Sequence, residues 1–145
     1  MYFPIVPIEQ VPVPEFPVGA SADRPVVLVV EDDAAVADAL IEILNKGGYA
    51  AIGAHNGADA VETALLMPPD LVVADASLPD MSGIDVAAVF RSRLPEMRIV
   101  LLDGDEAASG LVFAVVEKPV RPAELLAKVS ASLESRRADP AVTVS

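Results

Sequence analysis

Acidic residues stand where two short apolar runs of this chain end. Asp75 follows Leu71–Ala74, a run that is brief, partly β-branched and free of Gly and Pro, as a buried strand would be. The acidic run 31–33 follows a similar stretch, Val26–Val30. In open parallel sheets the ligand crevice lies at the carboxyl ends of the strands. We therefore expect these carboxylates to converge on one edge of a sheet, although a lone Asp in such a place is often only a helix cap.

Converging carboxylates predict a cation, because they repel one another unless a positive charge neutralises them. The chain has no Cys and a single His, so the ligands would be oxygen atoms, which suit a hard ion. Mg²⁺ fits best, since it keeps several waters and uses one or two carboxylates plus phosphate oxygens. Lys118 follows a later apolar run, and a lysine there neutralises a carboxylate or holds a phosphoryl oxygen.

Strands and helices that alternate along the chain would position these residues. Strands alternating with helices at this spacing predict βαβ units, a parallel sheet and right-handed crossovers. The expected strands are Val26–Val30, Tyr49–Ala54, Leu71–Ala74 leading to Asp75, Arg98–Leu102 and Leu111–Val116.

The expected helices lie between these strands and after the last one. Each shows apolar residues at helical spacing, which predicts one face packed on the sheet. The predicted helix faces carry Val36, Leu40, Ile43 and Leu44; Val61 and Leu65; Ile84, Val86, Val89 and Phe90; and Leu125, Leu126, Val129 and Leu133.

Composition limits the classes of protein that this chain could be. It has 145 residues, of which 53 % are hydrophobic, and a formal net charge of −12. The acidic balance argues against binding to nucleic acid, because phosphate contacts need clustered Lys and Arg. No apolar run is long enough to span a membrane, and no secretory signal opens the chain. We expect a cytoplasmic protein without nucleic-acid or membrane partners.

The two ends of the chain differ from its centre, and we predict an arm at residues 1–24, one folded domain at 25–137 and a flexible tail at 138–145. Six of the thirteen prolines lie within residues 1–25, interleaved with Ile, Val and Phe. Proline fixes φ and removes a donor, so the arm favours extended conformations. Three alternatives remain for it: packing on the domain or on a neighbouring molecule, disorder, or recognition by a partner module.

Residues from about 24 to 137 resemble the receiver domain of two-component response regulators. The motifs VVEDD, DASLPDMSG and EKP carry the resemblance together and in the family's order. The family implies a flavodoxin-like, doubly wound α/β fold with five parallel strands in the order 2-1-3-4-5. It also implies a phosphoprotein of a two-component phosphorelay rather than an enzyme, with self-phosphorylation and autodephosphorylation as its only reactions.

The resemblance also assigns roles to residues of this chain. Asp75 would accept the phosphoryl group as an aspartyl phosphate, and Lys118 would pair with that group. Asp32 would bind Mg²⁺ directly and Glu31 would bind it through water or by closer contact. The backbone carbonyl of Ser77 would complete the metal site. In-line phosphoryl transfer needs positioning and charge neutralisation more than covalent help, and these residue types supply both.

The chain departs from the family where phosphorylation is normally read out. Asp103 stands where the family has a Ser or Thr, and an ionised carboxylate cannot donate a hydrogen bond to a phosphoryl group. Val115 replaces the coupled aromatic residue. The segment 104–110 is too short for the family's fourth helix, which we predict to be rudimentary or absent. Asp103 could add a metal ligand, and Asp105 and Ser77 could tune autodephosphorylation by flanking the path of a water.

Two functions therefore compete. In the first, the chain is a single-domain response regulator phosphorylated on Asp75 by a histidine kinase or a phosphotransfer protein, and it signals by contact with a downstream protein. In the second, it is a pseudo-receiver, an interaction module that acts whether or not it is phosphorylated. An Mg²⁺-dependent phosphohydrolase is a third class, but it would need an acid where Ser77 stands. Homodimerisation is compatible with either of the first two functions, and the single histidine, His55, is predicted to be a surface residue.

Overall fold

Five strands and four helices lie along the described residues, 24–104 and 112–137, of the computed structural model, and they alternate except that no helix of these ranges separates the last two strands. The strands are β1 (Val26–Val30), β2 (Ala50–Ala54), β3 (Leu71–Asp75), β4 (Arg98–Leu102) and β5 (Ala114–Val116). The helices are α1 (Ala34–Lys46), α2 (Gly57–Leu66), α3 (Gly83–Arg93) and α4 (Pro122–Arg137).

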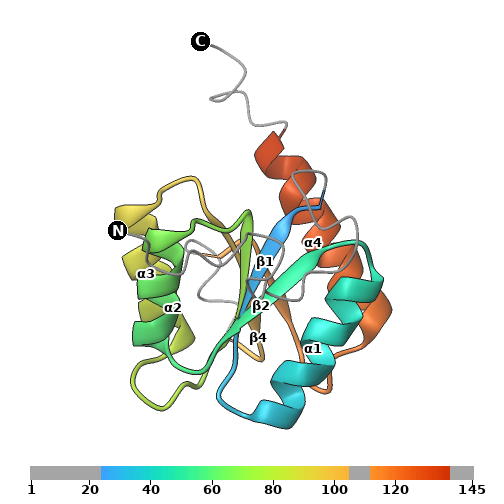
Figure 1. Cartoon of the computed structure of the whole chain (residues 1–145), viewed down its shortest axis with the longest axis horizontal. Coiled ribbons are helices and arrows are strands. Elements are labelled where there is room, and N and C mark those ends of the chain that lie inside the picture. The colour runs from blue at the N-terminus through green and yellow to red at the C-terminus, as the bar shows by residue number, and fades with distance from the viewer. Residues whose placement is uncertain (1–23, 105–111, 138–145) are drawn as a thin grey trace, which may run out of the picture.

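The strands form one parallel sheet in the order β2-β1-β3-β4-β5, which confirms the predicted doubly wound α/β fold. Figure 1 shows α2 and α3 on one face of the sheet and α1 and α4 on the other. The order reverses between β1 and β3, whose last paired residues are Val30 and Ala74. Ligands bind at such a reversal, outside the carboxyl ends of the strands. The next residues of both strands therefore stand at the place where a site is expected.

Polar caps set where three of the helices begin. The Asp33 carboxylate accepts hydrogen bonds from the backbone N–H groups of the first turn of α1, and Asn56 caps α2 in the same way. Ser82 and Asp85 form a reciprocal capping box at the start of α3. Such caps satisfy donors that have no partner inside the helix. Each of these helices therefore begins a few residues after the strand before it, next to the carboxyl edge of the sheet.

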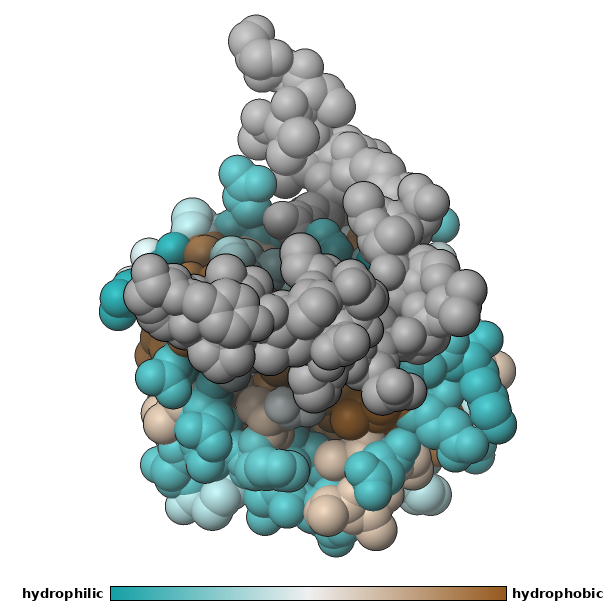
Figure 2. Space-filling view, viewed as in Figure 1, coloured by the Kyte–Doolittle hydropathy of each residue, from teal (hydrophilic) through white to brown (hydrophobic). Residues whose placement is uncertain are grey.

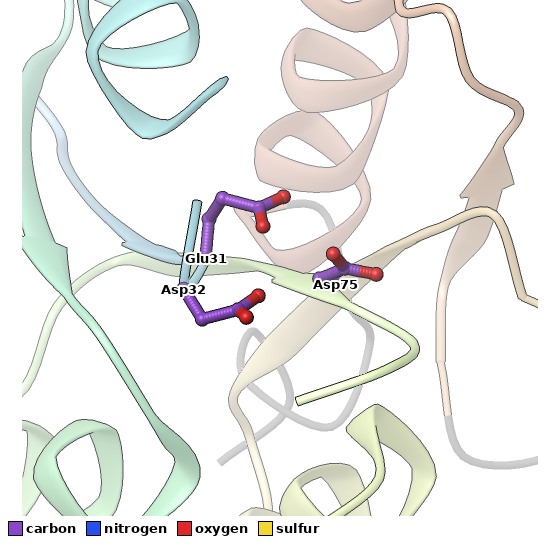
Figure 3. A group of neighbouring side chains, drawn as sticks. All are labelled: Glu31, Asp32 and Asp75. Atoms are coloured by element: carbon purple, nitrogen blue, oxygen red, sulfur yellow. The ribbon is translucent and has the colours of Figure 1, made fainter. Parts of the chain in front are cut away.

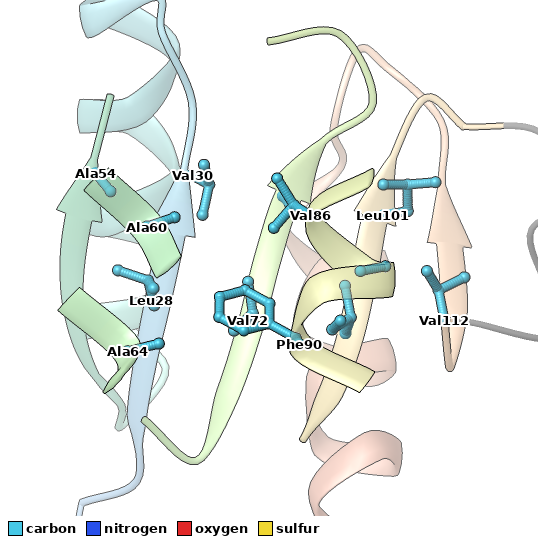
Figure 4. Close-up of a cluster of buried hydrophobic side chains, with 13 residues drawn as sticks. Leu28, Val30, Ala54, Ala60, Ala64, Val72, Val86, Phe90, Leu101 and Val112 are labelled. Carbon is cyan, nitrogen blue, oxygen red and sulfur yellow. The ribbon is translucent and has the colours of Figure 1, made fainter. Parts of the chain in front are cut away.

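The core consists of two apolar layers, one on each side of the sheet. Phe90, Val72 and Leu101 belong to the layer beneath α2 and α3, part of which Figure 4 shows. Leu44 and Leu125 belong to the layer beneath α1 and α4. Every residue of β3 is buried, as expected for the central strand of a parallel sheet covered on both faces. Figure 2 shows hydrophilic residues beside weakly hydrophobic ones over the part of the surface where α1 lies.

Two strands are shorter than predicted. Strand β5 comprises only Ala114–Val116, whereas the apolar run suggested 111–116. Val112 is buried in the core without strand pairing, and the Phe113 backbone N–H makes a separate hydrogen bond of 2.7 Å to the Ile99 carbonyl. Apolar runs mark burial and do not separate strand from buried loop. Strand β2 begins at Ala50, one residue later than predicted.

Of the two residues that we predicted to face inward on α2, Val61 packs against the core and Leu65 does not. The fully inward positions of the helix are Gly57, Ala60 and Ala64, whereas Val61 is half-buried and Leu65 is 39 % exposed. Small residues on the inward face let the helix backbone approach the sheet closely, which leaves its larger side chains at the border. The prediction for Leu65 was wrong because apolar spacing identifies a stripe, while helix contacts decide which edge of that stripe faces the core.

Several predictions concern residues outside the described ranges. These are the arm up to residue 23, the tail at 138–145, and most of the segment expected to lack the family's fourth helix, 105–111. The division of the chain into an arm, a domain at 25–137 and a tail therefore stays a prediction. Over the ranges that the structure does describe, none of the helices is long and apolar enough to cross a membrane.

Candidate functional site

Glu31 and Asp75 extend the paired strands β1 and β3 beyond the edge of the sheet, so the fold brings them together. Both side chains are buried, with Glu31 1 % exposed and Asp75 6 % exposed. Asp32 stands next to them and is open to solvent. Figure 3 shows the three carboxylates side by side at the ends of these strands. The site therefore forms because β1 pairs with β3, which brings together residues that are far apart in the sequence.

Lys118 reaches the same cluster from the segment that follows β5. Its Nζ atom lies 2.8 Å from Asp75 Oδ2 and 3.1 Å from Glu31 Oε1, close enough for hydrogen-bonded ion pairs with both. The peptide bond between Lys118 and Pro119 is cis. One ammonium thus joins carboxylates from two strands at a site from which much of the solvent is excluded.

These contacts shift the ionisation of all three groups. Burial alone would raise the pKa of Asp75, but hydrogen bonds from the Lys118 ammonium and the Ser77 N–H hold that pKa below its ordinary value. Burial raises the pKa of Glu31 above its ordinary value, although the Asp33 N–H and Lys118 oppose the rise. Burial would lower the pKa of Lys118, but the two carboxylates raise it. Asp75 is thus kept as a carboxylate and Lys118 as an ammonium near neutral pH.

The carboxylates of Glu31, Asp32 and Asp75 could share one cation. One oxygen from each lies within 4.8 Å of the others. When all three carboxylates are ionised, the single positive charge of Lys118 leaves two negative charges uncompensated. A divalent cation would neutralise them. An all-carboxylate donor set with open, solvent-facing positions suits Mg²⁺, which retains waters. The residues present therefore fit this ion.

The loop after β3 folds back on itself and orients Asp75. The Ser77 backbone N–H donates to Asp75 Oδ1 at 3.0 Å, and Ser77 also pairs with Ser82 across the loop. The Gly83 N–H donates to the Ala76 carbonyl at 2.9 Å. A Cβ atom at Gly83 would collide with the Asp75 carbonyl oxygen and lie 2.9 Å from Ala76 Cα, so only glycine fits this closure. The position of the Ser77 carbonyl as a metal ligand stays a prediction.

Asp80 is a structural residue of this loop to which the sequence analysis assigned no role. Its carboxylate accepts hydrogen bonds from the backbone N–H groups of Gly57, at 2.8 Å, and Ala58, at 2.9 Å. These bonds hold the pKa of Asp80 below its ordinary value. Asp80 thus joins the loop beside Asp75 to the start of α2. The pairing spans more than twenty residues of sequence, so no local pattern could have revealed it.

Among the described residues, the positions where the chain departs from the family are not members of the carboxylate cluster. Asp103 follows β4 with a left-handed φ of 60°, is exposed, and donates its backbone N–H to the Val116 carbonyl at 2.7 Å. Within the described ranges, the acidic group able to hold a cation does not include Asp103. Val115 is half-buried against the layer beneath α2 and α3. His55 is exposed, as predicted, and Asp105 lies outside the described residues.

The fold and this site define a doubly wound α/β protein with a carboxylate and lysine centre at its topological switch point. Residues 27–130 match the family model described as the response regulator receiver domain. The chain therefore belongs to this family, as its motifs predicted. Receiver domains are signalling domains of two-component systems, for which phosphorylation and Mg²⁺ binding are typical.

Similar proteins are known from both sequence and structure. The DNA-binding response regulator MtrA of Mycolicibacterium paratuberculosis is 34 % identical over 128 residues, covering 82 % of this chain and 56 % of MtrA. The chain thus spans about half the length of that relative. The response regulator TrrA of Thermotoga maritima, solved in complex with Mg²⁺–BeF, is 30 % identical with a TM-score of 0.71, covering 75 % of this chain and 99 % of TrrA. A CheY-like receiver from Methanospirillum hungatei is 25 % identical with a TM-score of 0.73, covering 79 % and 97 %.

Proposed function

We propose that this chain is a response regulator that accepts a phosphoryl group on Asp75 from a histidine kinase or a phosphotransfer protein. The observation that carries the proposal is the environment of the Asp75 carboxylate. It is buried, it is held ionised by Lys118 Nζ at 2.8 Å, and it is oriented by the Ser77 N–H at 3.0 Å. A carboxylate that is ionised, fixed and beside acidic metal ligands is suited to attack phosphorus.

In the proposed reaction an Asp75 oxygen attacks the phosphorus of a phosphohistidine. The new O–P bond forms as the N–P bond breaks, and the electron pair of that bond remains on the imidazole nitrogen, which takes up a proton. Lys118 would turn from Asp75 Oδ2 toward a phosphoryl oxygen, since its ammonium already lies within hydrogen-bond distance of the attacking carboxylate. A lysine in this place stabilises charge on the transferred group.

Magnesium would be held by Asp32, Asp75, Glu31 and the backbone carbonyl of Ser77. When bound, it would neutralise charge on the phosphoryl oxygens, which is its usual contribution to phosphoryl transfer. The presence of Mg²⁺ together with a beryllofluoride group in the TrrA complex supports this choice of ion. Glu31 lies 1 % exposed and already pairs with Lys118, so Asp32, which faces solvent, offers the freest carboxylate for a hydrated ion.

Output would pass by contact with a downstream protein rather than through DNA. The relatives named as DNA-binding are about twice as long as the matched region, and their DNA binding is a property of those proteins. The chain itself is strongly acidic, with a formal net charge of −12. Repulsion between like charges would weaken contact with a phosphate backbone.

A pseudo-receiver is the second candidate, and one residue after β4 and one within β5 favour it. Asp103 carries no hydroxyl with which to bond a phosphoryl group, and its carboxylate would repel one. Val115 has no ring that could swing inward. In this second function the acidic site survives, while binding to the downstream protein does not depend on phosphate.

Intact mass after incubation with acetyl phosphate and Mg²⁺ separates the two functions. We expect the native chain and the control variant Asp38→Asn, altered at an exposed position on α1, each to gain one phosphoryl group. The Asp75→Asn variant should gain none, because its amide is not a nucleophile. Omission of Mg²⁺ should prevent the gain in both the native chain and the Asp38→Asn variant. Absence of any gain from a folded, Mg²⁺-binding native chain would reject phosphorylation and support the pseudo-receiver.

A further inference from the structure

Helix α2 leaves its large apolar side chains at the surface. Gly57, Ala60 and Ala64 face the sheet, while Leu65 is 39 % exposed and Leu66 is 75 % exposed. Helix α2 has only ten residues, and its inward face is already complete without these leucines. Another surface must therefore cover them if they are to be removed from water. The outward face of α2 is therefore a candidate docking surface.

A groove lies along this face, between α2 and α3. It has a volume of about 530 Å³ and is lined by Val61, Leu65 and Leu66 from α2, Met81 from the loop before α3, and Val89 from α3. We call these residues the α2–α3 groove. The lining is almost entirely apolar, with Glu62 as its charged member. Such a groove suits an extended apolar segment better than a charged ligand.

The first described residue, Arg24, lies at the edge of the sheet where α2 ends, and its side chain donates hydrogen bonds to the carbonyls of Asn45 and Gly48 at the end of α1. Val26 donates its backbone N–H to Asp70 Oδ2 at 2.7 Å and accepts from the Asp70 N–H at 2.8 Å. Met67, which is 64 % exposed, ends α2 three positions before Asp70. Arg24 is two residues from Val26, and Asp70, the hydrogen-bonded partner of Val26, is three residues from Met67. The path from Arg24 to Met67 therefore has five residue-to-residue steps and one hydrogen-bonded contact. At the maximal reach per residue the two are within about 20 Å of each other.

The arm has the composition and length to occupy the groove. Residues 1–23 contain no Lys or Arg, and they carry three of the six Phe and Tyr residues of the chain. Proline favours extended conformations, so a proline-rich segment would lose little conformational freedom on docking. At about 3.1 Å per residue an extended segment of this length reaches about 70 Å, far more than the ~15 Å length of α2.

We propose that the α2–α3 groove is the docking site of the chain's own N-terminal arm, residues 1–23. The tether keeps the arm at high local concentration beside the groove, so modest apolar contacts are enough to hold it there. The docked arm would shield Leu65 and Leu66 on the helix that Asp80 ties to the loop beside Asp75. This docking is independent of whether Asp75 is phosphorylated.

The absence of native Cys makes thiol labelling a direct test. The Glu62→Cys variant places a thiol at the groove without removing an apolar side chain. A second variant combines Glu62→Cys with serine substitutions in the arm, which leave the charge of the arm unchanged. Serine replaces Ile5, Ile8, Val11, Val13 and Phe16.

We expect a neutral maleimide to label the thiol of the Glu62→Cys variant at least about tenfold more slowly when the arm is native than when it carries the Ser substitutions. A tenfold decrease corresponds to a groove that is covered for about nine-tenths of the time. Ala127→Cys, at an exposed position on α4, is the control and should react at the same rate with either arm. Equal rates at position 62 would overturn the proposal. Protection that disappears on dilution would also overturn it, because the occupant would then be a second copy.

A measurement on the native arm covers the case in which the substituted chain does not fold. A spin label at Gln10→Cys should broaden the amide resonances of α2 and α3 and leave those of α1 and α4 sharp. A mixture of two kinds of chain, one isotope-labelled without the spin label and the other spin-labelled without isotopes, should show no broadening. Sharp α2 resonances in the first sample, or broadened ones in the mixture, would contradict docking within one chain.

Discussion

Lys118 is the residue on which the electrostatics of the site depend. Its ammonium contacts a buried carboxylate from β1 and another from β3, at 3.1 Å and 2.8 Å. Two carboxylates in a partly desolvated place would otherwise repel each other, and one would take up a proton. Burial raises the pKa of Glu31, whereas hydrogen bonds from Lys118 and the Ser77 N–H lower that of Asp75.

Replacement of this lysine should therefore change the acid strength of its neighbour. In Lys118→Met we expect the pKa of Asp75 to rise, because its principal favourable partner is lost while burial remains. A lowered pKa contributes stability above the ordinary carboxyl pKa, and that contribution is lost as the pH falls through the folded-state value. Titration of the Asp75 carboxyl carbon by NMR measures the change.

Lys46→Met is the matched control for this titration. Lys46 forms an exposed ion pair with Glu42 on α1, so the substitution removes the same charge far from the site. It should leave the Asp75 titration unchanged. A similar rise in both variants would mean that net charge, rather than contact with Lys118, sets the pKa of Asp75.

Between elements, the connection from the β3–α3 loop to the start of α2 is made by Asp80. Its carboxylate holds the N–H groups of Gly57 and Ala58, and those bonds keep its pKa low. We expect Asp80→Asn to lower the free energy of unfolding at neutral pH. The difference from the native chain should vanish as the pH falls through the lowered pKa, since protonated Asp80 loses the same charge–helix interaction. Urea unfolding at several pH values measures it, and a difference independent of pH would contradict this role.

The same loop depends on Gly83 for its closure. A methyl group there would meet the Asp75 carbonyl oxygen, Leu101 Cδ1 at 2.6 Å and Ala76 Cα at 2.9 Å. We expect Gly83→Ala to destabilise the protein by about 1–3 kcal/mol, because backbone atoms must move. The rate of phosphorylation by acetyl phosphate should also fall, since the displaced backbone carries Asp75.

Gly53→Ala is the control for the Gly83 substitution. A methyl group at Gly53 would press only on the end of the Ile41 side chain, at 3.3 Å, and touch a backbone oxygen at 4.0 Å. It should change the free energy of unfolding by no more than about 0.5 kcal/mol. Equal losses at the two positions would mean that glycine is needed for general strand or helix geometry rather than for this closure.

For the molecule as a whole, stability depends on the apolar layers that hold the helices on the sheet. Phe90 is the largest fully buried side chain of the layer beneath α2 and α3. We expect Phe90→Ala to lower the free energy of unfolding by about 3–5 kcal/mol, because it removes apolar contacts and leaves a cavity. Phe113→Ala removes the same group from a position that is 40 % exposed, and it should cost about 1 kcal/mol or less. Urea unfolding measures both changes. Similar decreases in the free energy of unfolding for the two variants would contradict the role of Phe90 in the core.

Local patterns were sufficient to predict the order of the elements and the sites of the acidic residues. Strands β1, β3 and β4 agree with their apolar runs to within a residue, because buried parallel strands are continuous apolar stretches. The burial of Leu40 and Leu44 on α1 was likewise predicted from helical spacing. The prediction for Leu65 failed, because spacing alone does not show how close a helix approaches its sheet.

The sequence by itself determined which groups could react: carboxylates at strand ends, a lysine after the last strand, and no hydroxyl at position 103. The tertiary structure decided which of them meet. Pairing of β1 with β3 places Glu31 beside Asp75, and the turn after β5 brings Lys118 to both. Contacts between residues distant in the chain, including that of Asp80 with Gly57, depend on how layers pack. Short-range periodicity carries no information on such packing, so only the folded chain reveals it.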